Sequence, residues 1–138
     1  MDKQKPKVAV NIFVIKDNKL LLGKRRSTAG DGSWGLPGGK LEFMEHLIAG
    51  AKRELEEETS LIADLAFENI VNDPCDVDST HFLHINFLAN NIIGEPKLME
   101  PNKCYEWKYF SLDDLPEPIF IGHKKIIPAF IEKTVFID

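Results

Sequence analysis

The stretch GGKLEFMEHLIAGAKRELEEETSLI, residues 38–62, decides the fold of this chain. It opens on two consecutive glycines that follow a Leu-Pro pair, which predicts a turn able to use positive φ angles. Glu42 and Glu45 come next, at the place where the N-terminus of a helix favours negative charge. We therefore expect a helix from about Met44 to Thr59.

One side of this expected helix is apolar and its border is acidic. At about 100° per residue, one apolar stripe collects Leu47, Ile48, Ala51, Leu55 and, if the helix continues, Ile62. Glu54, Glu57 and Glu58 gather along the edge of that stripe, where like charges destabilise the helix and oppose its dipole. Arg53 can neutralise one carboxylate. An oxygen-only cluster of three carboxylates is what Mg²⁺ or Mn²⁺ prefers.

The spacing of these residues resembles the Nudix box, the signature of the Nudix hydrolases. Gly39 is followed after five residues by Glu45, and after seven more by the run Arg53-Glu54-Leu55. One residue later come Glu57 and Glu58, and after one more Ser60 and Leu61. Only Ser60 departs from the family pattern, which has a helix-ending glycine there. A solvated acidic helix face is the alternative, but it explains neither the glycine turn nor the Arg-Glu order.

Length and composition suit one globular domain over residues 1–138, since 43% of the residues are hydrophobic. The net charge of -5 argues against long nucleic acid as a partner, although an acidic enzyme can act on nucleotides when metal ions carry positive charge. Cys75 and Cys104 lack metal-ligand spacing and are expected to be reduced thiols of a cytoplasmic protein. Neither a secretion signal nor a membrane-spanning stretch is expected.

Before the box, Lys7–Ile15 reads as a strand covered on both faces, and Asp17-Asn18 as a turn into a second strand through residues 20–22. That hairpin ends in Lys24-Arg25-Arg26, so Arg25 or a neighbour either contacts phosphate or is a solvated strand end. Residues 27–35 form a loop that does not match a phosphate-binding P-loop. Trp34 within it is a core anchor or a base-stacking platform, with the anchor favoured.

After the box, residues 61–72 and 81–90 read as strands joined by a polar turn. Alternation puts His84 on one face and His81 on the other, which disfavours a metal pair. His84 is then a structural histidine or, as the second choice, a hydrogen-bond partner that reads a base. A loop over 91–103, an aromatic strand over 105–110 and a C-terminal helix over 119–131, interrupted or started by Pro128, complete the chain.

The Nudix resemblance implies an α/β fold, namely an α/β/α sandwich with a mixed β-sheet and a catalytic loop-helix-loop. It extends to LLGKRR, LPGGKLEF, EPKLMEPNKCYEW and DDLPEPIF, which are similar to MutT-like nucleoside triphosphate pyrophosphohydrolases, including a subgroup acting on oxidised or thiolated guanine nucleotides. These segments span most of Val8–Phe120. Two departures are Met44, where the family often has glycine, and Ile121, where related chains often have tryptophan.

The same resemblance implies hydrolysis of a nucleoside diphosphate linked to another group, here a nucleoside triphosphate giving monophosphate and pyrophosphate. Arg53 would orient a box glutamate, Glu45 would support the helix start, and the general base would be Glu54 or Glu100, the latter being otherwise a solvated loop acid. The expected ligands of Mg²⁺ or Mn²⁺ are Glu54, Glu57, Glu58 and the Gly38 carbonyl. The expected substrate contacts are Arg25, Gly39, Lys40, His84, Phe120 and Ile121.

Other readings stay open at this level. The box does not specify the leaving group, so a nucleotide sugar, ADP-ribose or a dinucleotide are alternative substrates. A catalytically silent Nudix domain that binds a nucleotide or a protein is a further alternative, although such chains often lose a box carboxylate and this one keeps all of them. An unrelated structural metal domain is disfavoured by the lack of Cys and His ligands. Related chains often dimerise, so a homodimer is possible.

Overall fold

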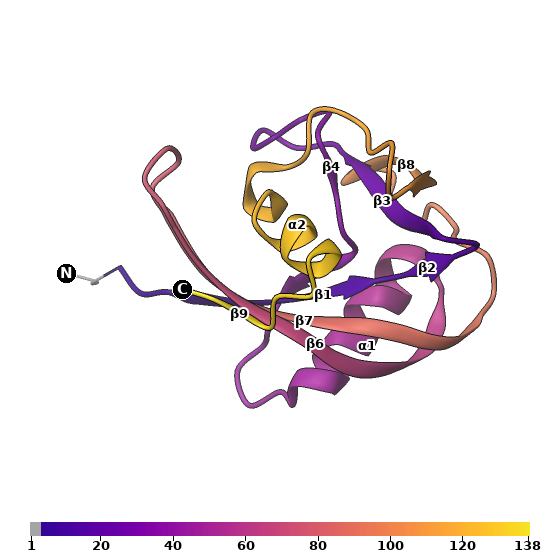
Figure 1. Cartoon of the computed structure of the whole chain (residues 1–138), viewed down its shortest axis with the longest axis horizontal. Helices are drawn as coiled ribbons and strands as arrows, with labels where there is room; N and C mark the ends of the chain where they lie inside the picture. The colour runs from indigo at the N-terminus through magenta and orange to yellow at the C-terminus, as the bar shows by residue number, and fades with distance from the viewer. Residues whose placement is uncertain (1–3) are drawn as a thin grey trace.

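The computed structural model describes residues 4–138, and a five-stranded sheet runs through its centre (Figure 1). Its strands lie in the order β5-β1-β7-β6-β9. Both β1–β7 and β6–β9 are parallel pairs and the others are antiparallel, which confirms the mixed sheet. The bounds are β5 Gly38–Lys40, β1 Lys7–Phe13, β7 Thr80–Ile93, β6 Ile62–Cys75 and β9 Phe136–Ile137.

A second sheet is built around β3. This strand, Lys19–Arg25, pairs with β2 (Ile15–Lys16), β4 (Trp34–Gly35) and β8 (Cys104–Ser111). The β2–β3 turn places Asp17 and Asn18 at φ angles of 52° and 61°, as a tight hairpin turn with two positive φ angles requires. The predicted hairpin is confirmed.

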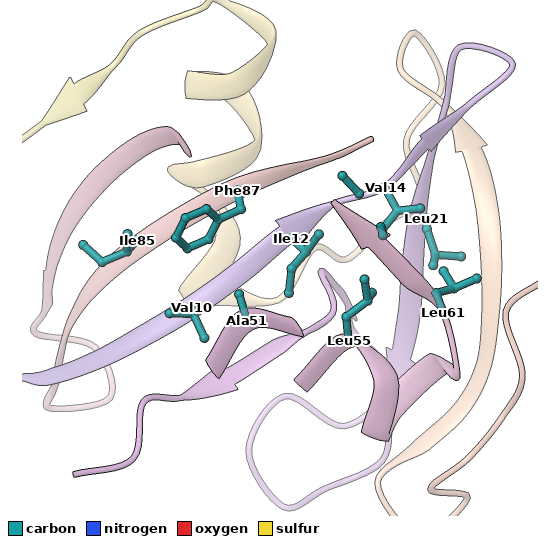
Figure 2. Close-up of a cluster of buried hydrophobic side chains, with 11 residues drawn as sticks. Val10, Ile12, Val14, Leu21, Ala51, Leu55, Leu61, Ile85 and Phe87 are labelled. Atoms are coloured by element: carbon teal, nitrogen blue, oxygen red, sulfur yellow. The ribbon is translucent and has the colours of Figure 1, made fainter. Parts of the chain in front are cut away.

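Helices cover both faces of the five-stranded sheet. Helix α1, Leu47–Thr59, packs Ala51 and Leu55 into one core with Val10, Ile12, Ile85 and Phe87 of the sheet (Figure 2). Helix α2, Ile126–Ile131, packs on the other face against Phe13 and Val71, after a 3₁₀ turn, η1, over Ile121–His123. This arrangement confirms the α/β/α sandwich and the expectation that β1 is covered on both faces.

Two smaller expectations also hold. Trp34 is 8% exposed and packs edge-on against Phe110 at a ring-centroid distance of 4.8 Å, so it is a core anchor. Cys75 and Cys104 are both free thiols.

The predicted start and apolar face of the central helix were partly wrong. The helix begins at Leu47, because Met44 adopts a φ angle of 68° that no α-helix contains. Leu47 and Ile48 are 40% and 47% exposed, so the buried stripe narrows to Gly50, Ala51, Leu55 and Thr59. Ile62 lies outside the helix and is exposed, while Leu61 takes the buried place.

The C-terminal prediction was also too simple. Instead of one helix over residues 119–131, the chain forms η1, then α2 with Pro128 in its first turn, where a missing N–H costs nothing. Strand β9 was not foreseen, since a two-residue strand leaves no periodic pattern. Strands β6 and β7 run three residues further than expected, to Cys75 and Ile93. No helix among residues 4–138 is long and apolar enough to cross a membrane.

Two residues that are not glycine adopt a left-handed backbone conformation, one just before α1 and one at its C-terminal end. The Nudix resemblance predicts glycine at both positions. Ser60 caps α1 at φ 63° and ψ 4°, and Met44 sits at φ 68° with its side chain 84% exposed. A residue with a side chain is destabilised by roughly 1–2 kcal/mol in this conformation, and glycine avoids that strain. Glycine also makes the unfolded chain more flexible, which offsets part of the stability gained by the substitution. We expect Ser60→Gly and Met44→Gly each to stabilise the protein by up to about 1 kcal/mol in urea unfolding.

The control for these changes is Glu56→Gly, an exposed position inside α1. There glycine should destabilise by about 1 kcal/mol, because helix interiors disfavour it. Destabilisation by glycine at all three positions would contradict the strain argument.

Candidate active site

Gly38 makes the closest approach of the turn before α1 to the central sheet. At φ 155° its added Cβ would collide with the Val10 carbonyl oxygen and lie 2.6 Å from Asn11 Oδ1, so only glycine fits. Pro37 and Leu41 form backbone hydrogen bonds to β1. In an antiparallel pair the bonded positions alternate with unbonded ones, so Gly38 directs its N–H and C=O away from β1. Those bonds are Ile12 N–H to Pro37 O at 2.9 Å and Leu41 N–H to Val8 O at 3.0 Å. The Gly38 N–H points to Glu58 Oε2, 3.5 Å away.

Gly39 lies directly against the carboxylate of Glu54. A Cβ on Gly39 would lie 2.5–2.6 Å from the carboxyl carbon and both oxygens of Glu54. Glu54 reaches this place from α1 and Gly39 from β5, so the missing side chain of the glycine allows the carboxylate to rest on the backbone of the sheet edge.

Glu58 carries a partly buried carboxyl beside Glu54, one helical turn further along α1. Burial raises the pKa of Glu58 well above its ordinary value, and the charge and hydrogen bonding of Glu54 raise this pKa further. The Gly38 N–H opposes this pKa shift in part. Glu100 adds negative charge from the loop before β8, and no salt bridge to Glu58 is present within residues 4–138. The pair is therefore a site of unbalanced negative potential.

Arg53 holds the outer carboxylates of the helix. Its Nε and Nη2 donate to the two oxygens of Glu45 at 2.7 and 3.0 Å, and its Nη1 donates to Glu54 at 2.9 Å and Glu57 at 3.3 Å. Nη2 also approaches the Lys40 carbonyl oxygen at 3.4 Å. This network ties the segment before α1, the middle of α1 and β5 together, and it fixes one oxygen of Glu54.

The Glu45–Arg53 pair makes stability depend on pH. Hydrogen bonding to Arg53 lowers the pKa of Glu45 to about 2, against about 4.3 in an unfolded chain. A carboxyl with a depressed pKa in the folded state contributes stability above its unfolded pKa and loses it as pH falls. We expect wild type to be more stable than Glu45→Gln at pH 6, with the difference in unfolding free energy shrinking between about pH 4.3 and pH 2.

Glu42→Gln is the matched control, because Glu42 is 3.8 Å from Arg53 and its side chain is 67% exposed. Its effect on the unfolding free energy should be small at every pH. A wild-type advantage over Glu45→Gln that stayed constant down to pH 2 would show that the pair is not the cause.

The donor set suits a divalent cation of the Mg²⁺ type. Glu54 and Glu58 offer oxygen atoms on one side of the glycine turn, and the Gly38 carbonyl faces away from β1. Glu57 has a side chain that is 52% exposed and lies on Arg53, so the predicted trio is not drawn together around one point. Within residues 4–138 no three His, Cys, Asp or Glu side chains form a ready cluster.

Arg25 lies at the other side of this acidic centre. Its guanidinium carbon is 3.7 Å from the ring centroid of Phe120, and its Nε is buried with no hydrogen-bond partner. Burial lowers the pKa of Arg25 and the negative charge of Glu58 opposes that shift, as expected for a cation near the carboxylate. No described residue forms an ion pair with Arg25.

Comparison with known proteins identifies this arrangement. Residues 5–130 match the model of the NUDIX domain family. The chain belongs to the Nudix family. Among curated relatives, an ADP-ribose pyrophosphatase of Methanocaldococcus jannaschii is 35% identical over 127 residues, covering 91% of this chain and 73% of the relative. The mouse oxidized purine nucleoside triphosphate hydrolase is 33% identical over 112 residues, covering 76% and 66%.

Solved structures agree on the fold. A MutT Nudix hydrolase from Burkholderia pseudomallei superposes with a TM-score of 0.86 at 29% identity, covering 93% of this chain and 99% of that one. With a complete set of box carboxylates and relatives that are hydrolases, this chain is a Nudix hydrolase.

The other predicted contacts of the Nudix site are spread around it. Lys40 follows the glycine turn on β5 with its side chain exposed, and Ile121 is half-buried in η1. His123, which sequence reasoning passed over, accepts the Leu36 N–H on its Nδ1 at 3.0 Å and packs against Phe120 at 5.0 Å. Burial lowers its pKa well below the ordinary value, so it is a neutral link between η1 and the glycine turn.

His84 is buried, 3% exposed, on the α2 face of the sheet. Burial lowers its pKa to about 4, so the ring is neutral at physiological pH. Its one side-chain partner is the buried Asn11, which also bonds to Asn86, and Asn86 in turn bonds to Asn69. Asn11 and Asn69 were not singled out from the sequence, whereas Asn86 was expected on the same face as His84. The signal available in the sequence was a polar residue inside each of three otherwise apolar strands.

Proposed function

We propose that this Nudix hydrolase cleaves nucleoside triphosphates to monophosphate and pyrophosphate with Mg²⁺, or Mn²⁺ in its place. The observation that carries the proposal is the partly buried Glu58 against Glu54, two carboxylates without a shared cation, near Arg25, a cation without a carboxylate partner. A metal-bound polyphosphate supplies both missing charges at once.

The residues divide the work as follows. Glu54, Glu58 and the Gly38 carbonyl would hold the divalent ion, and Glu57 would join them after leaving Arg53. When bound, such an ion neutralises charge on the phosphate oxygens and makes a bound water more acidic. Arg53 keeps Glu54 oriented through its 2.9 Å contact, and Glu45 keeps Arg53 in place. Glu54 is the first candidate to accept the proton of the attacking water, and Glu100 the second.

The substrate side rests on Arg25 and Phe120. The unpaired guanidinium is suited to a phosphate oxygen, since charge-assisted hydrogen bonds to phosphate are strong. Phe120 is half-buried beside Arg25, and it offers an aromatic face near the base end of a nucleotide. Gly30 and Gly122 leave room for the Phe120 ring. A Cβ added to either glycine would lie within 2.9 Å of that ring.

ADP-ribose is the second candidate substrate. The observation favouring it is the archaeal relative named ADP-ribose pyrophosphatase, which covers most of this chain. Both candidates place a pyrophosphate on the same carboxylates, so product identity distinguishes them.

The test is a substrate panel with purified protein and Mg²⁺ or Mn²⁺. Unmodified, oxidised and methylated nucleoside triphosphates, nucleotide sugars, ADP-ribose and dinucleotides are compared by kcat/KM, with products identified chromatographically. The expected result is pyrophosphate plus nucleoside monophosphate, abolished by a chelator. Faster conversion of ADP-ribose to AMP and ribose phosphate would select the second candidate. Absence of turnover on every substrate would indicate a silent binding domain.

A further inference from the structure

A row of four buried polar side chains crosses the α2 face of the central sheet, and the hydrolysis itself does not use it. The row consists of Asn11 on β1, His84 and Asn86 on β7, and Asn69 on β6, each at most 3% exposed. They occupy facing positions, since Asn11 pairs with Asn86 and Asn86 pairs with Asn69 across the sheet. Buried amides on an otherwise apolar face are costly unless they bond to one another or to something else.

The hydrogen bonds of the row run outward from Asn11, to His84 on one side and through Asn86 to Asn69 on the other. Asn11 Nδ2 donates to His84 Nδ1 and to Asn86 Oδ1, both at 3.0 Å. Asn86 Nδ2 then donates to Asn69 Oδ1 at 2.8 Å. Because His84 Nδ1 accepts, the proton of the neutral imidazole is on Nε2.

Both ends of the row are left unpartnered. His84 Nε2 and Asn69 Nδ2 are buried and have no hydrogen-bond partner. Given the direction of the internal bonds, both are N–H groups. The row therefore presents donors and no acceptor at these two atoms, and buried donors of this kind are stabilised when an acceptor bonds to them.

The orientation of Asn11 fixes this polarity. Its Oδ1 faces the Cα of Gly38, where an added Cβ would lie 2.6 Å from that oxygen. Turning the amide would aim an NH₂ group at a CH₂ that accepts no hydrogen bond. Reversing the row would also require turning Asn86 and Asn69 and moving the His84 proton.

The row starts at the catalytic turn and ends near the aromatic part of the site. Asn11 touches Gly38, whose N–H points to Glu58. At the other side, His84 lies between Phe82, at 5.7 Å between ring centroids, and His123, at 6.0 Å, and His123 in turn contacts Phe120. On the proposed function, a nucleotide with its phosphates at Glu58 would extend its base toward this side. His84 and His123 are both buried, so entry of the base would require the Phe120–His123 segment to move.

From these contacts we propose that the amide row is the base-reading wall of the nucleotide site, and that it selects a base presenting a carbonyl oxygen over the matching amino base. The proposal rests on the proposed nucleotide hydrolysis. A carbonyl accepts from His84 Nε2–H or Asn69 Nδ2–H, whereas an exocyclic amino group presents its own hydrogens to them. A site built from unpaired buried donors disfavours a base that presents an amino group, because the donors then stay without an acceptor.

Two substrate pairs that differ in an oxo or amino group test the proposal on the wild-type protein. These are ITP against ATP, and UTP against CTP, each measured as kcat/KM with Mg²⁺. The expected result is a preference of about tenfold or more for the oxo member of both pairs. Ratios near one in both pairs, with turnover intact, would overturn the proposal and assign the two donors to internal water.

Variants locate the preference. His84→Phe removes the donor and keeps an aromatic ring, and it should lower the oxo/amino ratio of kcat/KM in both substrate pairs. His84→Gln restores an N–H and should retain most of the ratio. His81→Phe is the matched control, because His81 sits on the same strand but bonds to Asn72 at 2.7 Å on the opposite face. An unchanged ratio in His84→Phe would overturn the assignment to His84.

Binding separates failure of this proposal from failure of the proposed function. IMP, AMP, UMP and CMP are titrated into wild type and His84→Phe by calorimetry, which needs no turnover. Tighter binding of IMP than AMP, lost in His84→Phe, would support the row even if no triphosphate were hydrolysed. Equal binding of all four monophosphates would overturn the row even if triphosphates were hydrolysed.

Discussion

Glu58→Gln is expected to lose most of its turnover and to melt at a higher temperature than wild type. The Glu58 side chain is partly buried, and its pKa is raised by desolvation and by Glu54. A carboxyl whose folded pKa is raised gives full stability at low pH and loses it as pH rises through the folded pKa, so at neutral pH the ionised group destabilises the fold. Glutamine removes that charge, can still accept the Gly38 N–H, and should stabilise the metal-free protein by about 0.5–2 kcal/mol.

Catalysis should change in the opposite direction. Removing a carboxylate proposed to hold the divalent ion should remove several kcal/mol of transition-state stabilisation, which corresponds to a kcat loss of about 10³-fold. Glu57→Gln should also lower kcat, without stabilising the protein, because Glu57 is half exposed and paired with Arg53. The measurements are kcat on the best triphosphate and thermal melts with and without Mg²⁺.

Glu56→Gln is the matched control for these variants, since Glu56 is exposed on the same helix and makes no side-chain bond within the described chain. It should leave both kcat and melting temperature close to wild type. Near-wild-type turnover in both Glu57→Gln and Glu58→Gln would rule out the box carboxylates as the catalytic centre.

Gly39→Ala is expected to fold and to lose about 10²-fold in kcat. Its Cβ would lie 2.5–2.6 Å from the Glu54 carboxyl group, which must move by about an ångström. Displacement of that size in a reacting constellation costs about two orders of magnitude. The side chain of Glu54 can swing, so unfolding free energy should change far less than kcat, as compared by urea titration and steady-state assay.

The control here is Gly32→Ala. A Cβ at Gly32 meets no atom within 4 Å, but the φ angle of 82° disfavours alanine. This variant should lose about 1 kcal/mol of stability and keep its kcat. If Gly39→Ala kept wild-type kcat, the placement of Glu54 on the glycine would not matter for the reaction.

The centre of the fold could be predicted from the sequence because its signals are local. The glycine turn, the Arg-Glu spacing and the covered strand over residues 7–15 each depend on neighbours a few positions away. Arg53 was expected to orient a box glutamate, and it lies 2.9 Å from Glu54. The predicted helix start at Met44 was wrong, because the chemistry of a methionine side chain does not indicate a positive φ angle.

What could not be predicted depends on residues far apart in the chain. Asn11 bonds to His84, 73 positions away, and His123 accepts the Leu36 N–H from 87 positions away. A single polar residue inside a strand gives no period, so its partner is visible only once the register is known.

Strand β1 serves both sides of the sheet at once. Its even-numbered residues, Val8, Val10 and Ile12, pack under α1, while Asn11 stands on the other face against Gly38 and His84. A one-residue insertion in β1 would exchange these faces and disturb the glycine turn, the core and the amide row together. If the amide row reads the base as proposed, substrate range would diverge among related chains through Asn69 on β6 and His84 on β7, while β1 stays in one register because the core and the glycine turn both depend on it.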